Sequence, residues 1–342
     1  MGPKYQRVLD KLAGDILSGR YAPGQKLPSE AGLVKQFATS RITIGRALRE
    51  LTQRGMVDRI AGSGTYVRQL AAAADSSLLG LFLPEMGTTE VFDPIYRGIA
   101  GASQSTRHGL LWGSTAAEFV ARKVAGVFFA PLELAADAQS ENLRIVAELE
   151  AARIPIVLLD RDVTAYPERS RYDLVGIDNR RAGYLAADHL LRAGVARVHF
   201  LALAGGAATV EARIAGFREA LLAAGAPLHA NPVHRVHAID AASVSAMLQA
   251  GDGFVCVNDR TAGELMHVAM AAGCRIPRDV RIVGIDDVEY ASLLPVPLTT
   301  VHQPCREIGE AAMAAMLARI ERPQMLARDI LLECRLVVRQ SG

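Results

Sequence analysis

The stretch SRITIGRALREL, residues 40–51, has the residue spacing of a helix with two unlike faces. Apolar side chains recur at intervals of three and four along one face: Ile44, Ala47, Leu48 and Leu51. The opposite face carries Ile42, Thr43, Arg46, Arg49 and Glu50. Ser40, just before the first turn, is a suitable N-cap. A face that holds two arginines and one carboxylate is suited to lie against an anion.

The neighbouring segments predict a winged helix-turn-helix. Residues 5–19 have apolar side chains at helical spacing and end near a glycine, so they predict a first helix. Ser29 is a suitable N-cap for a second helix, and a tight turn at Ala38 and Thr39 separates that helix from the third. Residues 55–67, GMVDRIAGSGTYV, predict two short strands joined by a glycine-rich turn. In such a fold the third helix enters the major groove of DNA, and its first residues reach the base edges.

The charge of the chain is divided unevenly. Residues 1–70 hold twelve Lys and Arg against five Asp and Glu, a net charge of +7. Because the whole chain carries +2, the other 272 residues carry −5. A small basic part on a mildly acidic body predicts a polyanionic partner for the basic part alone.

Length, hydropathy and cysteine content restrict the class of protein. A chain of 342 residues suits two or three compact units. No apolar run reaches the roughly 18 residues that a membrane span needs. The first residues, MGPKYQRVLDKLAGDIL, lack the apolar core and cleavage site of a signal peptide, so we expect a cytoplasmic protein with no membrane partner. The four cysteines lie far apart, so neither a zinc site nor a disulfide framework is expected.

Beyond an Ala-rich linker the chain alternates hydrophobic strands with helical stretches, which predicts an α/β fold with parallel sheets. The expected strands are LLGLFL, AGVFFA, IPIVLL, DLVGI, VHFLAL, GFVCV and RIVGI. Polar residues follow several of them, at the edge where open α/β sheets bind ligands. Asp160, Asn258 and Asp286 are predicted to bind a ligand, although each is also able to cap the next helix. Asp178 and Asn179 are predicted to act as caps.

The segment GQKLPSEAGLVKQFATSRITIGRALREL, residues 24–51, together with the wing resembles the DNA-binding domain of the GntR family of bacterial transcription regulators, over residues 4–67. The resemblance implies contacts with the phosphates and bases of double-stranded operator DNA. With the helix face described above, it predicts contacts from both helices of the motif and from the wing. The predicted residues are Ser29, Ser40, Arg41, Ile42, Thr43, Arg46, Arg49, Gly62, Ser63 and Gly64.

Four later stretches resemble the effector domain of the LacI/GalR family, which is related to periplasmic sugar-binding proteins. They are VGIDNRRAGYLAADHLLRAGVARVHFL, EARIAGFREALLAAG, VCVNDRTAGELMHVAMAAGCRIPRDVRIVGIDD and LTTVHQPCREIGEAAMAAML. The resemblance implies two lobes of parallel sheet joined by crossing strands, with a sugar or similar small effector in the cleft. The effector-binding residues that it implies are Phe92, Asp160, Arg161, Arg213, Asn258 and Asp286. Between LLWGST and AGVFFAP the chain is too short for the usual full helix, so a truncated helix is expected there.

The combination resembles hybrid regulators of the arabinose-repressor type. We expect a winged helix domain over residues 1–70, a linker over 71–77 and an effector domain over 78–342. The first lobe is expected to comprise about 78–160 and 289–322, and the second about 161–288 and 323–340. The resemblance further implies a homodimer on a palindromic operator that an inducing ligand releases. Corepression and activation stay open, because any ligand that binds two conformations with different affinity shifts their balance.

Two other classes of protein fit the sequence less well. An α/β enzyme acting on a sugar or nucleotide would need a catalytic or phosphate-binding motif, and we find no GxxxxGK[ST], no GxGxxG after a strand, no HExxH and no GxSxG. A transport-type binding protein would need a signal peptide and would not need the basic part. We therefore expect a transcription regulator with no catalytic residue, no metal and no cofactor.

Overall fold

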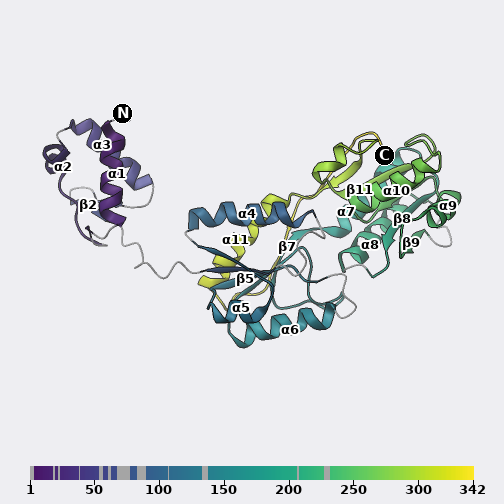
Figure 1. Ribbon diagram of the computed structural model, residues 1–342, viewed down its shortest axis with the longest axis horizontal. Helices are drawn as coiled ribbons and strands as arrows, with labels where there is room; N and C mark the ends of the chain where they lie inside the picture. Colours follow the sequence, from purple (N-terminus) through teal and green to yellow (C-terminus); the bar gives the residue numbers. More distant parts are fainter. Residues whose placement is uncertain are drawn as a thin grey trace. The chain divides into compact units, whose positions relative to one another are not determined.

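The structure of the chain is a computed structural model, and it describes residues 4–17, 20–21, 24–37, 39–53, 57–60, 63–67, 78–82, 90–106, 108–132, 138–205, 208–226 and 232–342. The chain divides into two compact units, Met1–Ser76 and Ser77–Gly342 (Figure 1). The linker predicted over residues 71–77 lies outside the described residues, as does Gly62. None of the helices in these ranges is long and apolar enough to cross a membrane.

The first unit packs its helices against a two-stranded wing, as the sequence predicts. Its elements are α1 (Lys4–Leu17), α2 (Glu30–Phe37), α3 (Arg41–Gln53), β1 (Val57–Ile60) and β2 (Gly64–Val67). Its core includes Leu9, Leu12, Leu33, Ile44 and Leu48, all buried. Because the apolar stripe of α3 faces this core, the opposite face of the helix is left for solvent or a partner.

The segment before α2 pairs with the wing. The backbone N–H of Leu27 donates to the carbonyl of Thr65 (2.8 Å), and the N–H of Val67 donates to the carbonyl of Gln25 (2.8 Å). The sequence predicts only a Pro-Gly turn in this segment. The pairing brings the basic side chain of Lys26 to the wing, opposite Tyr66.

The second unit contains two lobes, each built on a six-stranded sheet. Lobe 1 has the strand order β13-β7-β6-β5-β3-β4, with every neighbouring pair parallel. Its strands are β3 (Leu79–Phe82), β4 (Leu110–Gly113), β5 (Gly126–Phe129), β6 (Ile156–Leu159), β7 (Asp173–Ile177) and β13 (Asp329–Leu332). Lobe 2 has the order β14-β12-β11-β10-β8-β9, parallel except for β14. Its strands are β8 (Val198–Leu203), β9 (Val233–Val236), β10 (Gly253–Cys256), β11 (Arg281–Asp286), β12 (Thr299–His302) and β14 (Arg335–Val337).

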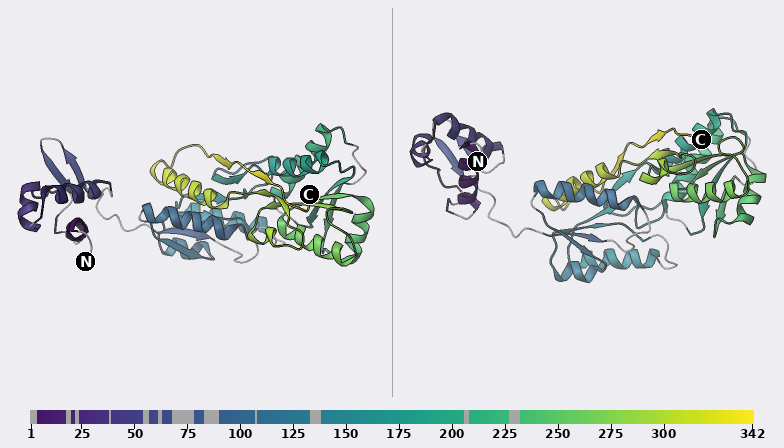
Figure 2. Two further views of the ribbon diagram at one scale, coloured as in Figure 1. Left: turned by 90° about the horizontal axis from the view of Figure 1, so that it is seen from above. Right: turned by 45° about the horizontal axis from the view of Figure 1, so that its top comes forward.

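Helices cover both faces of each sheet (Figures 1 and 2). Lobe 1 has α4 (Phe92–Thr106) and α11 (Cys305–Glu321) on one face and α5 (Ala116–Ala121) and α6 (Ala138–Ala151) on the other. Lobe 2 has α7 (Asn179–Arg192) and α8 (Ala208–Ala223) on one face and α9 (Ala241–Ala250) and α10 (Asp259–Ala271) on the other. A short 3-10 helix, η1 (Glu289–Ser292), follows β11. The six-residue length of α5 confirms the truncated helix expected in the first lobe.

The chain passes between the lobes at three places, and this corrects the predicted lobe boundaries. The passages follow β7, β12 and β13, at residues 177–179, 302–305 and 332–335. The prediction assigns β7 and β13 to the second lobe, but β7 pairs with β6 and β13 in lobe 1. It assigns β12 to the first lobe, but β12 pairs with β11 in lobe 2. Such short hydrophobic strands suit either sheet, so their lobe is set by pairing and not by composition.

Close helix crossings position the side chains described below. A Cβ at Gly183 in α7 would lie 1.9 Å from the carbonyl oxygen of Arg213 in α8, and a Cβ at Gly216 would lie 1.7 Å from a carbonyl oxygen of α7. In lobe 1, α4 and α11 meet in the same way at Gly98 and Gly309. Because glycine has no Cβ, the backbones of α7 and α8 approach closely enough for the Arg213 side chain to reach the start of α7.

Candidate DNA-binding face and effector site

Serine residues cap α2 and α3, as the sequence predicts. Ser29 Oγ accepts a hydrogen bond from the N–H of Gly32 (3.1 Å), and Ser40 Oγ accepts one from the N–H of Thr43 (3.3 Å). The Ser40 and Thr43 hydroxyls also share a hydrogen bond of 2.9 Å. Ile42, between them, is 83 % exposed. An apolar side chain held out at this end of a recognition helix is available for a thymine methyl group.

Arginines extend from the same part of α3. Arg41 is exposed and forms an ion pair with Glu30 of α2 (3.3 Å). Arg46 stacks over the ring of Tyr5, 4.0 Å from the ring centroid. Arg49, also exposed, lies about one turn further along α3. Stacking orders a guanidinium while its N–H groups, which lie in the plane of the guanidinium itself, still point outward, so Arg46 keeps donors for a phosphate or a guanine.

The wing has its own polar contacts. The Ser63 and Tyr66 hydroxyls share a hydrogen bond of 2.7 Å, and the Lys26 ammonium lies 5.8 Å from the centroid of the Tyr66 ring. Gly64 has φ +139°, and a Cβ there would lie 2.5 Å from Cε of Lys26. Glycine is therefore required at this point of the wing. Tyr5 and Lys26 are absent from the predicted DNA-contact residues, because their place depends on packing and strand pairing.

Polar side chains from both lobes meet where the strands end. We name this set the interlobe cluster: Asp160, Arg161, Asn179, Arg213, Asp286 and Gln303. Most of its members come from carboxyl ends of strands: Asp160 and Arg161 after β6, Asn179 after β7, Asp286 at the end of β11 and Gln303 after β12. Arg213 reaches the cluster from α8. The structure thus brings four of the six predicted effector-binding residues together and adds Asn179 and Gln303 to them.

Arg213 joins three elements of lobe 2. Its Nε donates to Asn179 Oδ1 (2.8 Å), its Nη1 donates to the carbonyl of Val257, and its Nη2 lies 3.5 Å from Asp286 Oδ1. The Arg213 side chain is only 8 % exposed. A buried guanidinium needs such acceptors, and its planar fork fixes how it is oriented.

Asp160 joins lobe 1 to the second passage between the lobes. Arg161 Nε donates to Asp160 Oδ2 (3.1 Å), and Gln303 Nε2 lies 3.5 Å from Asp160 Oδ1. Gln303 is 2 % exposed, yet its Oε1 has no hydrogen-bond partner among the described residues. An unpartnered buried oxygen costs about 1–3 kcal/mol, which a ligand hydroxyl would recover. Gln303 follows the strand TTVH as the other cluster residues follow theirs, a signal that the sequence prediction did not use.

Carboxylates outnumber cations around Asp286. Burial raises the pKa of the Asp286 carboxyl well above its usual range, and the charge of Arg213 offsets only part of this effect. The neighbouring carboxylates of Asp259, Asp160 and Glu90 raise the pKa further. Burial also raises the pKa of Asp259, which is fully enclosed beneath the cluster. The surroundings of Asp286 therefore disfavour additional negative charge.

Aromatic side chains of lobe 1 border the cluster. Phe92, the first residue of α4, stacks on Tyr96 with ring centroids 6.0 Å apart, and the Arg161 guanidinium lies 5.6 Å from the Phe92 ring centroid. Tyr96 meets Trp112 edge-on at 5.4 Å. Trp112 is the single tryptophan of the chain and is 51 % exposed. Its emission is therefore suited to report a change in packing at Phe92.

One capping prediction needs correction, and a residue predicted to bind a ligand also serves as a cap. Asp178 is the N-cap of α7, as predicted, and accepts from the N–H of Arg181 (3.0 Å). Asn179 is predicted as a cap, but its Oδ1 accepts from Arg213. Asn258, predicted as a ligand-binding residue that is also able to cap, caps α10 by accepting from the N–H of Thr261 (2.9 Å), and its contact with a ligand stays a prediction. Its amide NH₂ group is the part that remains to donate to a ligand.

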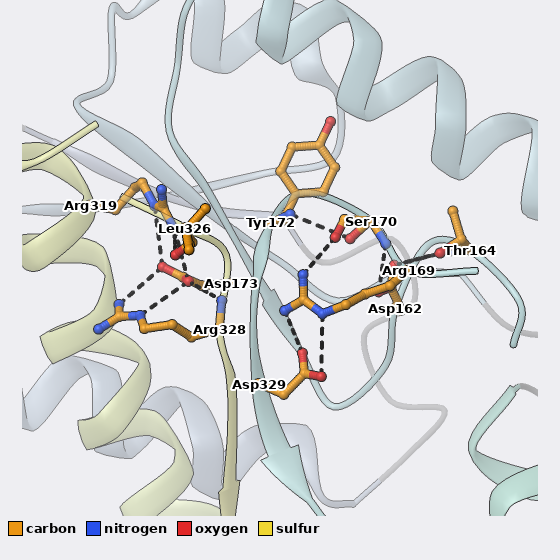
Figure 3. Close-up of polar contacts among 10 residues, drawn as sticks. All are labelled: Asp162, Thr164, Arg169, Ser170, Tyr172, Asp173, Arg319, Leu326, Arg328 and Asp329. Atoms are coloured by element: carbon orange, nitrogen blue, oxygen red, sulfur yellow. Dashed lines mark hydrogen bonds and ion pairs between the residues drawn. The ribbon is translucent and has the colours of Figure 1, made fainter. Parts of the chain in front are cut away.

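The loop that follows Asp160 and Arg161 is held by its own polar contacts (Figure 3). Asp162 accepts from the backbone N–H of Thr164 (3.1 Å) with one oxygen and from that of Ser170 (3.1 Å) with the other. Arg169 forms a two-point contact with Asp329 of β13, at 2.6 and 3.3 Å. These contacts tie the loop beside the cluster to the strand that leads into the third passage.

Asp173, the first residue of β7, is enclosed by two arginines (Figure 3). Arg319 of α11 and Arg328 both donate to its carboxylate, at 2.9 and 3.1 Å for the closest guanidinium nitrogens, and the backbone N–H of Arg328 donates to it as well (2.8 Å). Burial raises the pKa of Asp173, but the hydrogen bonds from Arg328 and Arg319 outweigh it and hold the pKa below its usual range. This group fixes the outer end of β7, far along the strand from the cluster.

The sequence matches two known families. Residues 4–67 match the bacterial regulatory proteins of the gntR family, and residues 187–342 match the periplasmic binding protein-like domain. The arabinose metabolism transcriptional repressor of Geobacillus stearothermophilus is 27 % identical over 375 residues, which cover 99 % of this chain and 97 % of that protein. The ribose operon repressor of Bacillus subtilis is 25 % identical over 282 residues, which cover 80 % of this chain and 84 % of that one.

A solved structure of a LacI family regulator resembles the larger part of the chain. A LacI family transcriptional regulator from Enterococcus faecium, solved with bound ribose, superposes with a TM-score of 0.65 at 26 % identity and covers 78 % of this chain and 98 % of its own. The relatives are transcription repressors and not enzymes. Within the described ranges, no three His, Cys, Asp or Glu side chains are grouped as a metal ion would require. The chain is a ligand-responsive transcriptional repressor of the hybrid type, in which a GntR-family winged helix-turn-helix is joined to a LacI/GalR-type effector domain.

Proposed function

We propose that the chain binds a palindromic operator as a homodimer and is released from it by a neutral sugar that binds at the interlobe cluster. The observation that carries the proposal is the cluster itself, in which donors and acceptors from both lobes converge around a buried, unpartnered Gln303 Oε1. Closely spaced donors and acceptors suit a ligand with several hydroxyl groups. Two relatives are repressors of arabinose and ribose genes, which supports a sugar as the effector.

The charge balance favours a neutral sugar over a phosphorylated one. The Asp160 and Asp286 carboxylates are each within 3.5 Å of a guanidinium nitrogen, so Arg161 and Arg213 are already engaged. Glu90 and Asp259 add negative charge near Asp286. A phosphate would enter a site with no spare cation in the cluster and would meet these carboxylates. Sugar phosphates are therefore expected to bind much more weakly than the parent sugars.

The first unit supplies the DNA contacts. We assign phosphate and base contacts to Arg46 and Arg49, a thymine contact to Ile42, and backbone contacts to the wing at Ser63 and Gly64. A dimer would place two such units on half-sites about one helical turn apart. Because operator DNA is a cytoplasmic target in bacteria, we place the protein in the cytoplasm.

The three passages between the lobes couple the binding of a sugar to the rotation of the lobes. Gln303 lies in the second passage and Asn179 in the first, so a ligand that contacts both acts directly on the segments about which the lobes rotate. A ligand shifts the balance between an open and a closed arrangement only by the difference of its affinities for the two. A sugar that bridges Asp160 of lobe 1 and Asp286 of lobe 2 has that difference, because only closed lobes make both contacts.

Tryptophan emission tests the effector half of the proposal. The purified protein is titrated with L-arabinose, D-ribose, D-xylose, D-glucose and D-galactose and with their commercially available phosphates. At least one neutral sugar is expected to change the Trp112 emission with saturation, and Arg213→Ala is expected to abolish the change while the protein stays folded. A response to the phosphates alone would contradict the charge argument, and saturation that survives Arg213→Ala would place the ligand elsewhere.

A further inference from the structure

A pocket of about 530 Å³ lies mainly on lobe 2, and two of its lining residues, Glu90 and Tyr290, interact electrostatically with Asp286 of the interlobe cluster. Its walls come from α10, from the region of η1, from the segment after β9 and from one residue of lobe 1. The lining includes the apolar side chains of Ile239, Val268 and Leu294 and the polar or charged side chains of Glu90, Arg260, Glu264, His267 and Tyr290. Its volume lies in the range of about 300–1,000 Å³ that is typical of sites for small organic ligands.

Three lining residues lie close in the sequence to residues that we assign to the effector. Glu90 is two residues before Phe92, Arg260 is two residues after Asn258, and Tyr290 is four residues after Asp286. Because these three lining residues lie on three separate elements, the nearness of the pocket to the effector residues does not depend on one segment of the chain. The pKa of Tyr290 also places it near these residues. Burial raises the pKa of the Tyr290 phenol, and the charges of Glu90 and Asp286 raise it further.

We infer that this pocket receives the aglycone of a glycoside whose sugar ring occupies the interlobe cluster. The inference rests on the proposed function and names the effector class more closely. The apolar side chains suit a flat, mostly apolar ring, and Gly263 of α10 leaves room for it, since a Cβ there would meet only Leu294 at 3.5 Å. Tyr290 adds to the lining a hydroxyl group that is able to donate to, or accept from, an oxygen of the aglycone. Arg260 and Glu264 of the lining form an ion pair with each other (3.4 Å), which leaves fewer polar groups for the hydroxyls of a second sugar ring.

Calorimetric titration of the full chain separates the two parts of such a ligand. The probes are matched pairs of methyl and 4-nitrophenyl glycosides of arabinose, xylose, glucose and galactose. For a sugar that binds, the 4-nitrophenyl glycoside is expected to bind at least about tenfold more tightly than the methyl glycoside, since even partial burial of an aromatic ring has that effect. Equal affinities would overturn the inference and leave the proposed function standing. Tighter binding of the corresponding disaccharide than of the aryl glycoside would also overturn it.

Variants that fill the pocket locate the ring. Gly263→Leu is expected to remove the preference for the aryl glycoside and to leave the affinity for the methyl glycoside unchanged. Leu294→Phe narrows the same pocket from the η1 side and serves as the second variant if Gly263→Leu does not fold. Met270→Leu, on the same helix outside the pocket, is the matched control and is expected to keep the preference. A preference that survives both filling variants would overturn the inference, and the absence of binding by every sugar and glycoside would overturn the proposed function with it.

Discussion

Replacing Gly183 by alanine tests whether the crossing of α7 and α8 sets the position of Arg213. The new methyl carbon would lie 1.9 Å from the carbonyl oxygen of Arg213. Ordinary contact between such atoms begins at about 3.5 Å, so the two helices must separate by roughly 1.5 Å. Overpacking of this kind costs about 1–3 kcal/mol, and the backbone on both sides of the contact places Gly183→Ala at the upper end. The same shift lengthens the 2.8 Å hydrogen bond from Arg213 Nε to Asn179 beyond hydrogen-bond distance.

The assay combines urea unfolding with sugar titration followed by Trp112 emission. Gly183→Ala is expected to lose about 3 kcal/mol of stability and to bind the effector at least about tenfold more weakly, because Arg213 no longer faces Asp286. Gly101→Ala is the matched control: Gly101 lies inside α4, and a Cβ there would meet no atom within 4 Å. That substitution is expected to raise stability by about 0.5–1 kcal/mol and to leave sugar binding unchanged. Unchanged stability and affinity in Gly183→Ala would refute the role given to the crossing.

Three further changes test other parts of the account. Arg46→Ala is expected to weaken operator binding and to retain sugar binding. The slope of log K for operator DNA against log salt concentration is expected to become shallower by about one, and an unchanged slope would exclude a phosphate contact from Arg46. Asp173→Asn leaves Arg319 and Arg328 without their counter-charge and is expected to cost about 3–5 kcal/mol in urea unfolding; a loss below about 1 kcal/mol would contradict this. Because the folded-state pKa of Asp173 lies below the ordinary value of 3.8, its stabilisation is complete above that pH and is lost as the pH falls through the folded pKa, so the wild-type advantage over Asp173→Asn should shrink in acid. Burial lowers the pKa of His234 below its ordinary value of 6.5, so the stability that the neutral imidazole contributes is present above pH 6.5 and is lost as the pH falls through the folded pKa. His234→Gln is expected to reduce this loss of stability in urea unfolding at a series of pH values. A pH dependence identical to that of the wild type would contradict the prediction.

The strands and the polar residues after them were open to prediction because both follow from local sequence. Runs such as IPIVLL and RIVGI have the length and the β-branched, hydrophobic content of strands in a buried parallel sheet, and Asp160 and Asp286 follow at their ends. The wing and the caps of α2 and α3 rest on local turn and capping chemistry in the same way.

Other features depend on contacts between residues far apart in the chain. The strand β13, with the sequence DILL, joins lobe 1 by pairing with β7 more than 150 positions earlier, and nothing in four residues specifies that partner. Gln303 becomes a site residue only because the second passage carries it to Asp160, 143 positions away. Asn179 looks like a helix cap until α8 brings Arg213 beside it. In each case the role is set by packing of whole elements, which single-sequence patterns do not encode.

Control of DNA binding by the sugar is measured by fluorescence anisotropy of the purified protein on DNA from upstream of its own gene, at physiological salt and with and without the neutral sugars. We predict tight, specific binding that one neutral sugar weakens, and we predict that Asp286→Ala keeps the DNA affinity and loses the response to that sugar. Binding that no sugar changes, or that sugar phosphates alone weaken, would contradict the claim that a neutral sugar at the interlobe cluster controls the DNA-binding unit.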